Sequence, residues 1–304
     1  MKKLFDHQIS GVAFLKEKKR AILADEMGLG KTKQAIHAAV EQPVLIVCPA
    51  SLRLNWKREI EDVYPDHNVV VLRTKSDGEE KARWYIVNYD ILYKWVEWAK
   101  NMNFPTTILD EAHYIKSKSK RSEQALELVK DIPNVYLLTG TPILNRPIEM
   151  FNMLKAIKHP LGKLRTTFAR RYCGGQMKTL VRDILNGRSF FVDPKRSFPY
   201  RAKKEQYRVF TFLDDTGATH LDELRSFTSD VILRREKKDT LDLPEKIITT
   251  TLYELIPEQR RAYEAAWDEY LLWLETHPDV SRDIENIKSA QQLVELMKLK
   301  QVCS

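Results

Sequence analysis

Six short apolar runs alternate with helical patterns in the first half of this 304-residue chain, and this alternation constrains its fold most strongly. Each run is apolar on both faces and bounded by polar residues, as expected of a strand buried on both sides. The runs span residues 21–25, 43–49, 69–72, 84–89, 106–111 and 135–140. Helical patterns such as "TKQAIHAAV" and "SLRLNWKREIEDV" separate them. The alternation predicts an α/β fold, a parallel sheet with helices on both faces.

A glycine-rich stretch, "ADEMGLGKTKQAI", follows the first of these runs. Gly30, Lys31 and Thr32 fit the end of the phosphate-loop pattern, and Asp25 stands where its first glycine is expected. Gly28 and Gly30 would let the backbone approach phosphate oxygens, while Lys31 reaches the β- and γ-phosphates and Thr32 contacts Mg²⁺. The alternative is a glycine turn with a surface lysine. The strand–turn–helix setting favours the phosphate site.

The second motif, "ILDEAHYIKS", places two adjacent carboxylates at a strand end. We assign Asp110 to Mg²⁺, through its waters, and Glu111 to the base that accepts a proton from the attacking water. The alternative is a solvated acidic pair. His113 is not expected to bind zinc, because no second ligand lies at a useful spacing.

The third motif, "LLTGTPILN", contributes Thr139 and Thr141, which would relay hydrogen bonds from the γ-phosphate site. Alone it would also fit a strand followed by a turn. Because ligands bind at the carboxyl ends of parallel strands, all three motifs are expected in one crevice.

Together these motifs resemble those of superfamily-two helicases, and specifically the Swi/Snf-type DNA translocases. The family's phosphate loop usually reads D-E-M-G-L-G-K-T, which stands here as Asp25 to Thr32. "LFDHQISGVAFL" is similar to the adenine-reading Q motif, with Gln8 as its glutamine and His7 where an aromatic residue is common. "VLIVCPASLRLNWKREIE" resembles the motif that contacts DNA backbone, and "SDVILRREKKDTLDLPEKI" resembles the R-R-x-K-x-D…L-P-x-K signature. The resemblance covers nearly the whole chain and implies a first RecA-like lobe.

The resemblance implies ATP and Mg²⁺ as cofactors and double-stranded or branched DNA as partner. Lys31, Asp110 and Glu111 would be catalytic, and Thr32 and Asp110 would hold the metal. The implied nucleotide contacts are Gln8, Met27, Gly28, Leu29, Gly30, Lys31 and Thr32. The candidate DNA contacts are Ser51, Arg53, Lys116, Arg146, Arg201, Lys203 and Lys204. The basic run around Lys116 fits a solvated turn equally well. Arg146–Pro147, "FARRYCGG" and "DTGATHLDEL" look like the annealing-helicase branch.

The pattern changes after about Lys158, which divides the chain into three regions. Residues 1–158 are predicted to form the RecA-like lobe, and residues 159–245 a mainly helical insertion with a basic and aromatic loop. Residues 246–304 are predicted to supply a strand and linker helices that lead to a second RecA-like lobe. The predicted elements are helices over 220–238, 257–275 and 289–302 and a strand over 246–255.

The insertion carries a basic and aromatic segment, and the insert between Cys173 and Asp215 is longer than expected for the branch. From residue 181 to residue 208, eight Lys and Arg face three Asp and Glu, a local net charge of +5. The interleaved aromatic residues are Phe190, Phe191, Phe198, Tyr200 and Tyr207. This composition suits contact with a phosphate backbone and stacking on bases. The alternative is a solvated loop folded over a small apolar cluster.

Bulk properties place weaker limits on function. The net charge of +8 permits a polyanionic partner without requiring one. No apolar run approaches the roughly 20 residues that cross a bilayer, and "MKKLFDHQ" lacks the apolar segment of a signal peptide. The three scattered cysteines indicate a reducing compartment. We therefore expect no membrane partner and a cytoplasmic location in a prokaryotic or viral system, or a nuclear one in a eukaryote.

The resemblance also implies a second RecA-like lobe that supplies an arginine finger, and "MKLKQVCS" resembles the segment leading into it. The predicted function is therefore the ATP-binding lobe of a DNA-dependent ATPase that translocates on or remodels duplex DNA, with little hydrolysis by the lobe alone. The first alternative is a non-catalytic, nucleotide-gated DNA- or protein-binding module. A second is an unrelated phosphate-loop kinase or GTPase, against which "DEAH" and "LLTGTP" argue.

Overall fold

The computed structural model describes residues 3–140, 146–185, 187–192, 206–241 and 254–276. The chain divides into two compact units, Met1–Leu243 and Pro244–Ser304. Among the described residues, no helix is long and apolar enough to cross a membrane.

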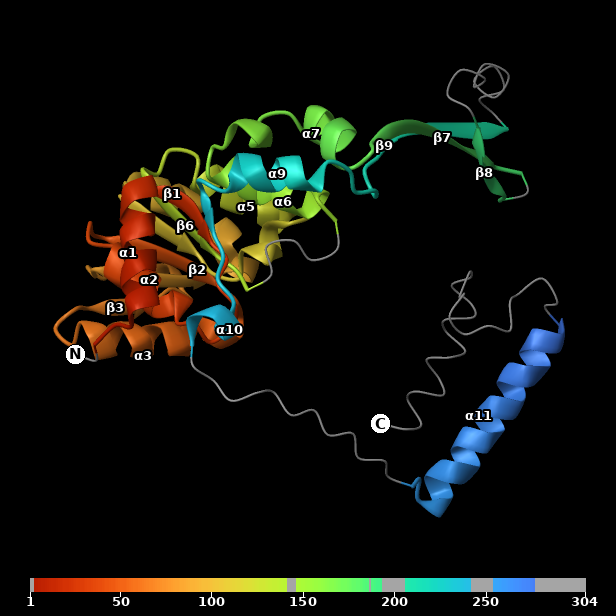
Figure 1. Ribbon diagram of the computed structural model, residues 1–304, viewed down its shortest axis with the longest axis horizontal. Helices are drawn as coiled ribbons and strands as arrows, with labels where there is room; N and C mark the ends of the chain where they lie inside the picture. The colour runs from red at the N-terminus through yellow and green to blue at the C-terminus, as the bar shows by residue number, and fades with distance from the viewer. Residues whose placement is uncertain (1–2, 141–145, 186, 193–205, 242–253, 277–304) are drawn as a thin grey trace. The chain divides into compact units, whose positions relative to one another are not determined.

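A parallel sheet forms the centre of the first unit (Figure 1). It has seven strands in the order β10-β1-β6-β5-β2-β4-β3. Every neighbouring pair is parallel. The strands are β1 Arg20–Leu23, β2 Val44–Cys48, β3 Val69–Val71, β4 Trp84–Asn88, β5 Thr106–Leu109, β6 Asn134–Leu138 and β10 Ile232–Leu233. The first six confirm the six apolar runs, and the parallel sheet confirms the predicted α/β class.

Both faces of this sheet are buried, which explains why its strands are continuously apolar. Val44 and Ile46 of β2 pack into one hydrophobic core with helices α1, α2 and α3, whereas Leu45 and Val47 pack into a second core with α4, α5 and α6. Burial of each such side chain contributes about 1.5–3 kcal/mol. Two opposed cores therefore hold the strand ends in fixed positions.

The helices carry their apolar residues on the face that meets the sheet; in α3, Trp56, Ile60 and Val63 are buried at helical spacing. The helices of the first unit are α1 Asp6–Lys18, α2 Lys31–Ala38, α3 Arg53–Val63, α4 Val96–Asn101, α5 Lys120–Leu128, α6 Ile148–Ala156, α7 Arg165–Tyr172, α9 Leu221–Thr228 and α10 Lys237–Thr240. Short 3₁₀ segments are η1 Ala50–Leu52, η2 Lys75–Glu79, η3 Tyr89–Lys94, η4 Ala112–Ile115 and η5 Pro160–Gly162.

The prediction of one helix over residues 220–238 is wrong. Helix α9 ends at Thr228, and the following residues form β10, which pairs with β1 through Ile232 opposite Ile22 and Leu233 opposite Leu23. Pairing at the open edge of the sheet satisfies backbone groups of β1 and overrides the local helical pattern. After β10 the chain continues alongside the residues next to β1 and then forms helix α10.

The prediction of a mainly helical insertion also needs correction, because this region contains a three-stranded antiparallel sheet with the order β8-β7-β9 (Figure 1). The strands are β7 Gln176–Asp183, β8 Ser189–Val192 and β9 Tyr207–Asp214. Its glycines suggested loops, but Gly187, at φ 69°, lies in the connection between β7 and β8. Buried Thr179 and Val181 alternate with exposed Lys178 and Arg182, which is the strand signal that the glycines obscured.

In the second unit, α11 Pro257–Thr276 confirms the helix predicted over 257–275. The predicted helix over 289–302 lies outside the described residues, and so do residues 246–253 of the predicted strand over 246–255.

Candidate active site

The strand order brings the three sequence motifs to one edge of the central sheet. Strand β6 lies between β1 and β5, and β2 follows on the other side of β5. All four are parallel, so the segments after their carboxyl ends are neighbours. These segments carry the glycine loop, the third motif, the acidic pair and the start of α3, respectively. The convergence expected from the sequence is therefore present.

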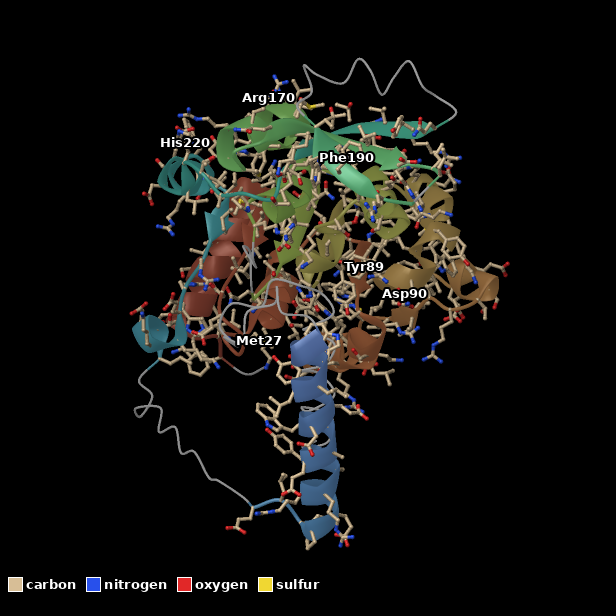
Figure 2. All side chains as sticks on the ribbon, turned by 90° about the vertical axis from the view of Figure 1, so that its right-hand side faces the viewer. Met27, Tyr89, Asp90, Arg170, Phe190 and His220 are labelled. Carbon is tan, nitrogen blue, oxygen red and sulfur yellow. The ribbon has the colours of Figure 1, made fainter. Side chains whose placement is uncertain are left out.

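The loop between β1 and α2 has the conformation of a phosphate cradle. Gly28 and Gly30 have φ values of 91° and 75°, which side-chain-bearing residues rarely adopt. A Cβ on Gly30 would also lie 2.3 Å from Nε2 of Gln8. Leu29 is buried, whereas Met27, labelled in Figure 2, is 66% exposed at the loop surface. These glycine conformations let the loop turn directly into α2, whose first backbone N–H groups are available to an anion.

Lys31 begins α2 and folds back over the loop. Its Nζ donates hydrogen bonds to the carbonyl oxygens of Asp25, at 2.7 Å, and Glu26, at 3.3 Å. Burial lowers the pKa of the Lys31 ammonium, while the charges of Glu111, Asp25 and Asp110 oppose this shift. The lysine therefore lies in the electrostatic field of the acidic pair, although the two motifs lie 79 residues apart.

Asp110 follows β5 and is held by two hydrogen bonds. Its Oδ2 accepts from Nε1 of Trp56 at 2.7 Å, and its Oδ1 accepts from the backbone N–H of Glu111 at 2.9 Å. The hydroxyl of buried Tyr89, labelled in Figure 2, donates to the Asp110 carbonyl at 2.8 Å. Burial raises the pKa of Asp110, and the Trp56 hydrogen bond partly counters it. Each carboxylate oxygen keeps lone pairs for a metal-bound water, so this oxygen group fits Mg²⁺.

Glu111 occupies the left-handed region, at φ 46° and ψ 55°, directly after Asp110. A non-glycine residue in this region costs on the order of 1–3 kcal/mol, and such strain clusters at functional sites. Oε2 of Glu111 lies 3.1 Å from Nδ1 of His113, within ion-pair distance but without hydrogen-bond geometry.

The third motif contributes Thr139 and Gly140 to the described structure. Thr139 is fully buried, and its N–H donates to the carbonyl of Leu23 at 3.1 Å. A Cβ on Gly140 would lie 2.9 Å from Cγ of Met27 and 3.8 Å from Nζ of Lys31, so this segment lies against the phosphate loop. Thr141 lies outside the described residues.

An arginine that sequence reasoning missed holds the loop from the side. Nε of Arg235 donates to Oδ1 of Asp25 at 3.0 Å and its NH2 donates to Oδ2 at 2.5 Å, a bidentate ion pair with a fully buried carboxylate. NH2 also donates to Oε1 of Gln34 at 2.8 Å, and NH1 donates to Oγ of Ser10 and the carbonyl of His7. All five guanidinium N–H groups are thus used. Asp25 is the structural partner of this arginine.

The Q-motif residues meet the same loop. His7, Gln8 and Gln34 all donate to the Leu29 carbonyl, at 3.1, 3.4 and 3.1 Å. Beside them is a cavity of about 590 Å³ lined by His7, Ser10, Arg234, Arg235, Glu236, Asp239 and Thr240. Gln8 is buried rather than open to this cavity, and its Oε1 accepts from the N–H of Phe5.

Comparison with known proteins identifies the family. The model of the SNF2-related domain matches residues 7–304. The chain belongs to the SNF2-related family. This confirms the resemblance and excludes an unrelated kinase or GTPase.

Two relatives and one solved structure show how far this likeness extends. The chain is 32% identical over 284 residues to the human DNA annealing helicase and endonuclease ZRANB3, covering 88% of this chain and 24% of the relative. It is 34% identical over 259 residues to a Caenorhabditis elegans SWI/SNF-related matrix-associated actin-dependent regulator of chromatin subfamily A-like protein 1 homolog, covering 81% and 33%. The Sulfolobus solfataricus SWI2/SNF2 ATPase core in complex with dsDNA shares the fold, with a TM-score of 0.60, 24% identity, and coverage of 99% and 58%. The chain thus spans about a quarter to a third of these curated relatives.

The candidate DNA contacts of this SNF2-related lobe are placed in part. Ser51 and Arg53 follow β2, Lys116 follows η4, and exposed Arg146 precedes α6, so all lie on segments after neighbouring strands. Lys116 forms a 3.4 Å ion pair with Glu149. Arg201, Lys203 and Lys204 lie outside the described residues.

Three further residues of the SNF2-related site could not be assigned from their motifs. Trp56 lies on the buried face of α3, Tyr89 follows β4 and begins η3, and Arg235 lies 210 positions from its partner Asp25. The paired arginines in the R-R-x-K signature were the available signal for Arg235. Nothing in the local sequence indicates which partner each residue meets.

Proposed function

We propose that this lobe binds ATP with Mg²⁺ at the carboxyl edge of its central sheet and forms one half of a DNA-dependent ATPase that translocates on or remodels duplex DNA. One observation carries the proposal: the glycine loop with Lys31 and the acidic pair Asp110–Glu111 meet at one sheet edge, within each other's electrostatic field. Family membership supports nucleotide use.

The loop geometry suggests how the nucleotide is held. The phosphates would occupy the cradle of Met27, Gly28, Leu29 and Gly30, with Lys31 leaving its carbonyl partners for the β- and γ-oxygens. The cavity lined by His7 would take the base. Gln8, which is buried beside this cavity, would hold the loop next to the base through its hydrogen bonds with Phe5 and Leu29.

The acidic pair suggests the catalytic division of labour. Asp110 and the Thr32 hydroxyl would hold Mg²⁺, which neutralises charge on the phosphate oxygens when it is bound. Glu111 would accept the proton of the attacking water. Its backbone holds the left-handed conformation directly after Asp110. Because Lys31, Thr32, Asp110 and Glu111 are all present, we do not favour a non-catalytic module.

We propose duplex or branched DNA as the polymer, which the lobe contacts through Ser51, Arg53, Lys116 and Arg146. These positions follow the carboxyl ends of β2, β5 and β6, next to the nucleotide edge. The Sulfolobus core is described in complex with dsDNA, and human ZRANB3 is described as a DNA annealing helicase. Arg201, Lys203 and Lys204 remain candidates from the sequence alone.

We further propose that a second RecA-like lobe completes the hydrolysis site. The Sulfolobus core is longer than the region matched here, since this chain covers 58% of it. Closure of two lobes would add an arginine finger, worth about 10³–10⁵ in rate at related sites. The 304-residue chain alone should bind nucleotide weakly and hydrolyse it very slowly.

The test compares ATP hydrolysis by the chain joined to its natural downstream sequence, with and without duplex DNA. Glu111→Gln should lower kcat by about 10²–10⁴ while nucleotide binding persists, and Lys31→Ala should weaken binding itself. Glu97→Gln, the same change at an exposed site on α4, is the matched control. Equal activity of Glu111→Gln and the parent would refute the base assignment. Rapid DNA-stimulated turnover by the 304-residue chain alone would refute the need for a second lobe.

A further inference from the structure

One face of the β8-β7-β9 sheet combines exposed aromatic rings with basic side chains. In the register, Leu180 lies opposite both Phe191 and Phe210, and Lys178 lies opposite Phe212. Residues directly opposite share a face. The aromatic face therefore consists of Gln176, Lys178, Leu180, Arg182, Ser189, Phe191, Arg208, Phe210, Phe212 and Asp214.

The aromatic face is open to solvent, whereas its reverse is largely buried along the central strand. Phe191, Phe210 and Phe212 are 64%, 49% and 41% exposed, and the rings of Phe191 and Phe212 are 6.3 Å apart. On the reverse, Thr179 and Val181 of β7 are at most 1% exposed. Phe190, labelled in Figure 2, also lies on the reverse, opposite Val181. The side bearing the three rings is thus the side available to a ligand.

The charges on the aromatic face point to an anion. Arg182 lies directly opposite Arg208, and like charges in such a pair repel each other. Among the described residues, the guanidinium group of neither arginine has an ion-pair or hydrogen-bond partner. Lys178, by contrast, is paired with Asp214 at 2.5 Å and lies over the Phe191 ring. An anion bridging the two arginines would convert this repulsion into binding.

We propose that the aromatic face binds single-stranded DNA, with unpaired bases stacked on Phe191, Phe210 and Phe212 and a phosphate between Arg182 and Arg208. The choice of DNA as the polymer rests on the proposed function. Rings spaced along a sheet beside cations form the platform used for single strands, because every base offers a π-face. A duplex keeps its bases stacked inside and offers these rings nothing to stack on.

The same charges argue against a second copy of the chain as the occupant. Two aromatic faces brought together would oppose the unpaired guanidinium groups of Arg182 and Arg208 with like charges, since Lys178 is already paired with Asp214. Single-stranded DNA supplies both the flat apolar groups and the negative charge that the face needs.

The test uses the complete 304-residue chain and fluorescence anisotropy of a labelled oligothymidine of about 20 nucleotides and of a duplex. Replacing Phe191 and Phe210 together by alanine should weaken oligothymidine binding at least about tenfold and leave duplex affinity within about twofold. Phe191→Trp should preserve single-strand binding, whereas Phe191→Leu should not. Arg182→Ala with Arg208→Ala should weaken binding and flatten its salt dependence.

Phe227→Ala with Arg225→Ala is the matched control, since both side chains are exposed on α9, away from the β-sheet strands. Nucleotide binding by each variant separates this inference from the proposed function, because it should not change. Unaltered oligothymidine affinity of Phe191→Ala/Phe210→Ala would overturn the proposal. So would equal single-strand binding by Phe191→Leu and Phe191→Trp. A parent dimer that these substitutions dissociate, with DNA binding intact, would instead identify a self-association surface and overturn it.

Discussion

The arginine beside the phosphate loop and the two arginines of the aromatic face differ in whether their guanidinium groups have partners within the protein. Arg235 uses all five N–H groups within the protein and holds the buried carboxylate of Asp25. Arg182 and Arg208 face each other on an exposed sheet without a partner among the described residues. One guanidinium therefore fixes a site internally, while the other two leave their hydrogen-bonding capacity for something outside.

This difference separates residues that position a site from residues that meet a ligand. A buried ion pair is costly to break because the remaining charge stays out of water. Removing an exposed cation changes the free energy of unfolding little. Stability measurements should therefore respond to Arg235 and binding measurements to Arg182 and Arg208.

The largest effect is expected from Arg235→Ala, which leaves the fully buried Asp25 carboxylate without its partner. We expect a loss of about 3–5 kcal/mol in the free energy of unfolding, measured by urea denaturation. Arg234→Ala, at an exposed neighbouring position, should change it by less than about 0.5 kcal/mol.

The double variant Asp25→Ala/Arg235→Ala removes both charges and should recover part of the loss. A double variant as unstable as the sum of its single changes would show that the ion pair is not the source of the effect. Arg235 would then no longer differ from Arg182 and Arg208 as a residue that positions a site.

The central fold was predictable because its signal is local. A strand buried on both faces must be apolar throughout, so β1 to β6 could be located as apolar runs bounded by polar residues. The β8-β7-β9 sheet and β10 were missed for a different reason. Their formation depends on partners far along the chain, such as Ile22 for Ile232 and Phe212 for Lys178. In the β8-β7-β9 region the glycines suggested loops, which hid the alternation of buried and exposed residues. At β10 an overlapping helical pattern suggested a helix instead of a strand.

The site divides in the same way. Gly28, Gly30 and Lys31 were predictable from their spacing, because consecutive residues determine the geometry of the loop. The hydrogen bond from Trp56 to Asp110 and the ion pair from Arg235 to Asp25 join distant segments. A single sequence contains both residues of such a pair but does not show that they are in contact.

A smaller effect is expected at Lys31, which meets a ligand but is also partly buried. Burial lowers its pKa below the ordinary 10.5, so the ammonium destabilises the fold at neutral pH. Lys31→Met should weaken nucleotide binding yet raise Tm slightly at pH 7, a gain kept small because the ammonium is partly solvated. Since the unfolded state binds the extra proton, the gain should shrink as pH rises from the lowered pKa toward 10.5. A gain that grows with pH would contradict this assignment.

The smallest effect on stability is expected from Arg182→Glu, which places a carboxylate opposite Arg208. Replacing a like-charge pair by an opposite-charge pair should raise the free energy of unfolding by about 0.2–1 kcal/mol. The same change should abolish oligothymidine binding, because the anion site is then filled from within. Lys130→Glu, an equal charge change at an exposed turn after α5, should affect neither quantity comparably. If Arg182→Glu lowered stability and left binding intact, the sheet arginines would be structural, like Arg235.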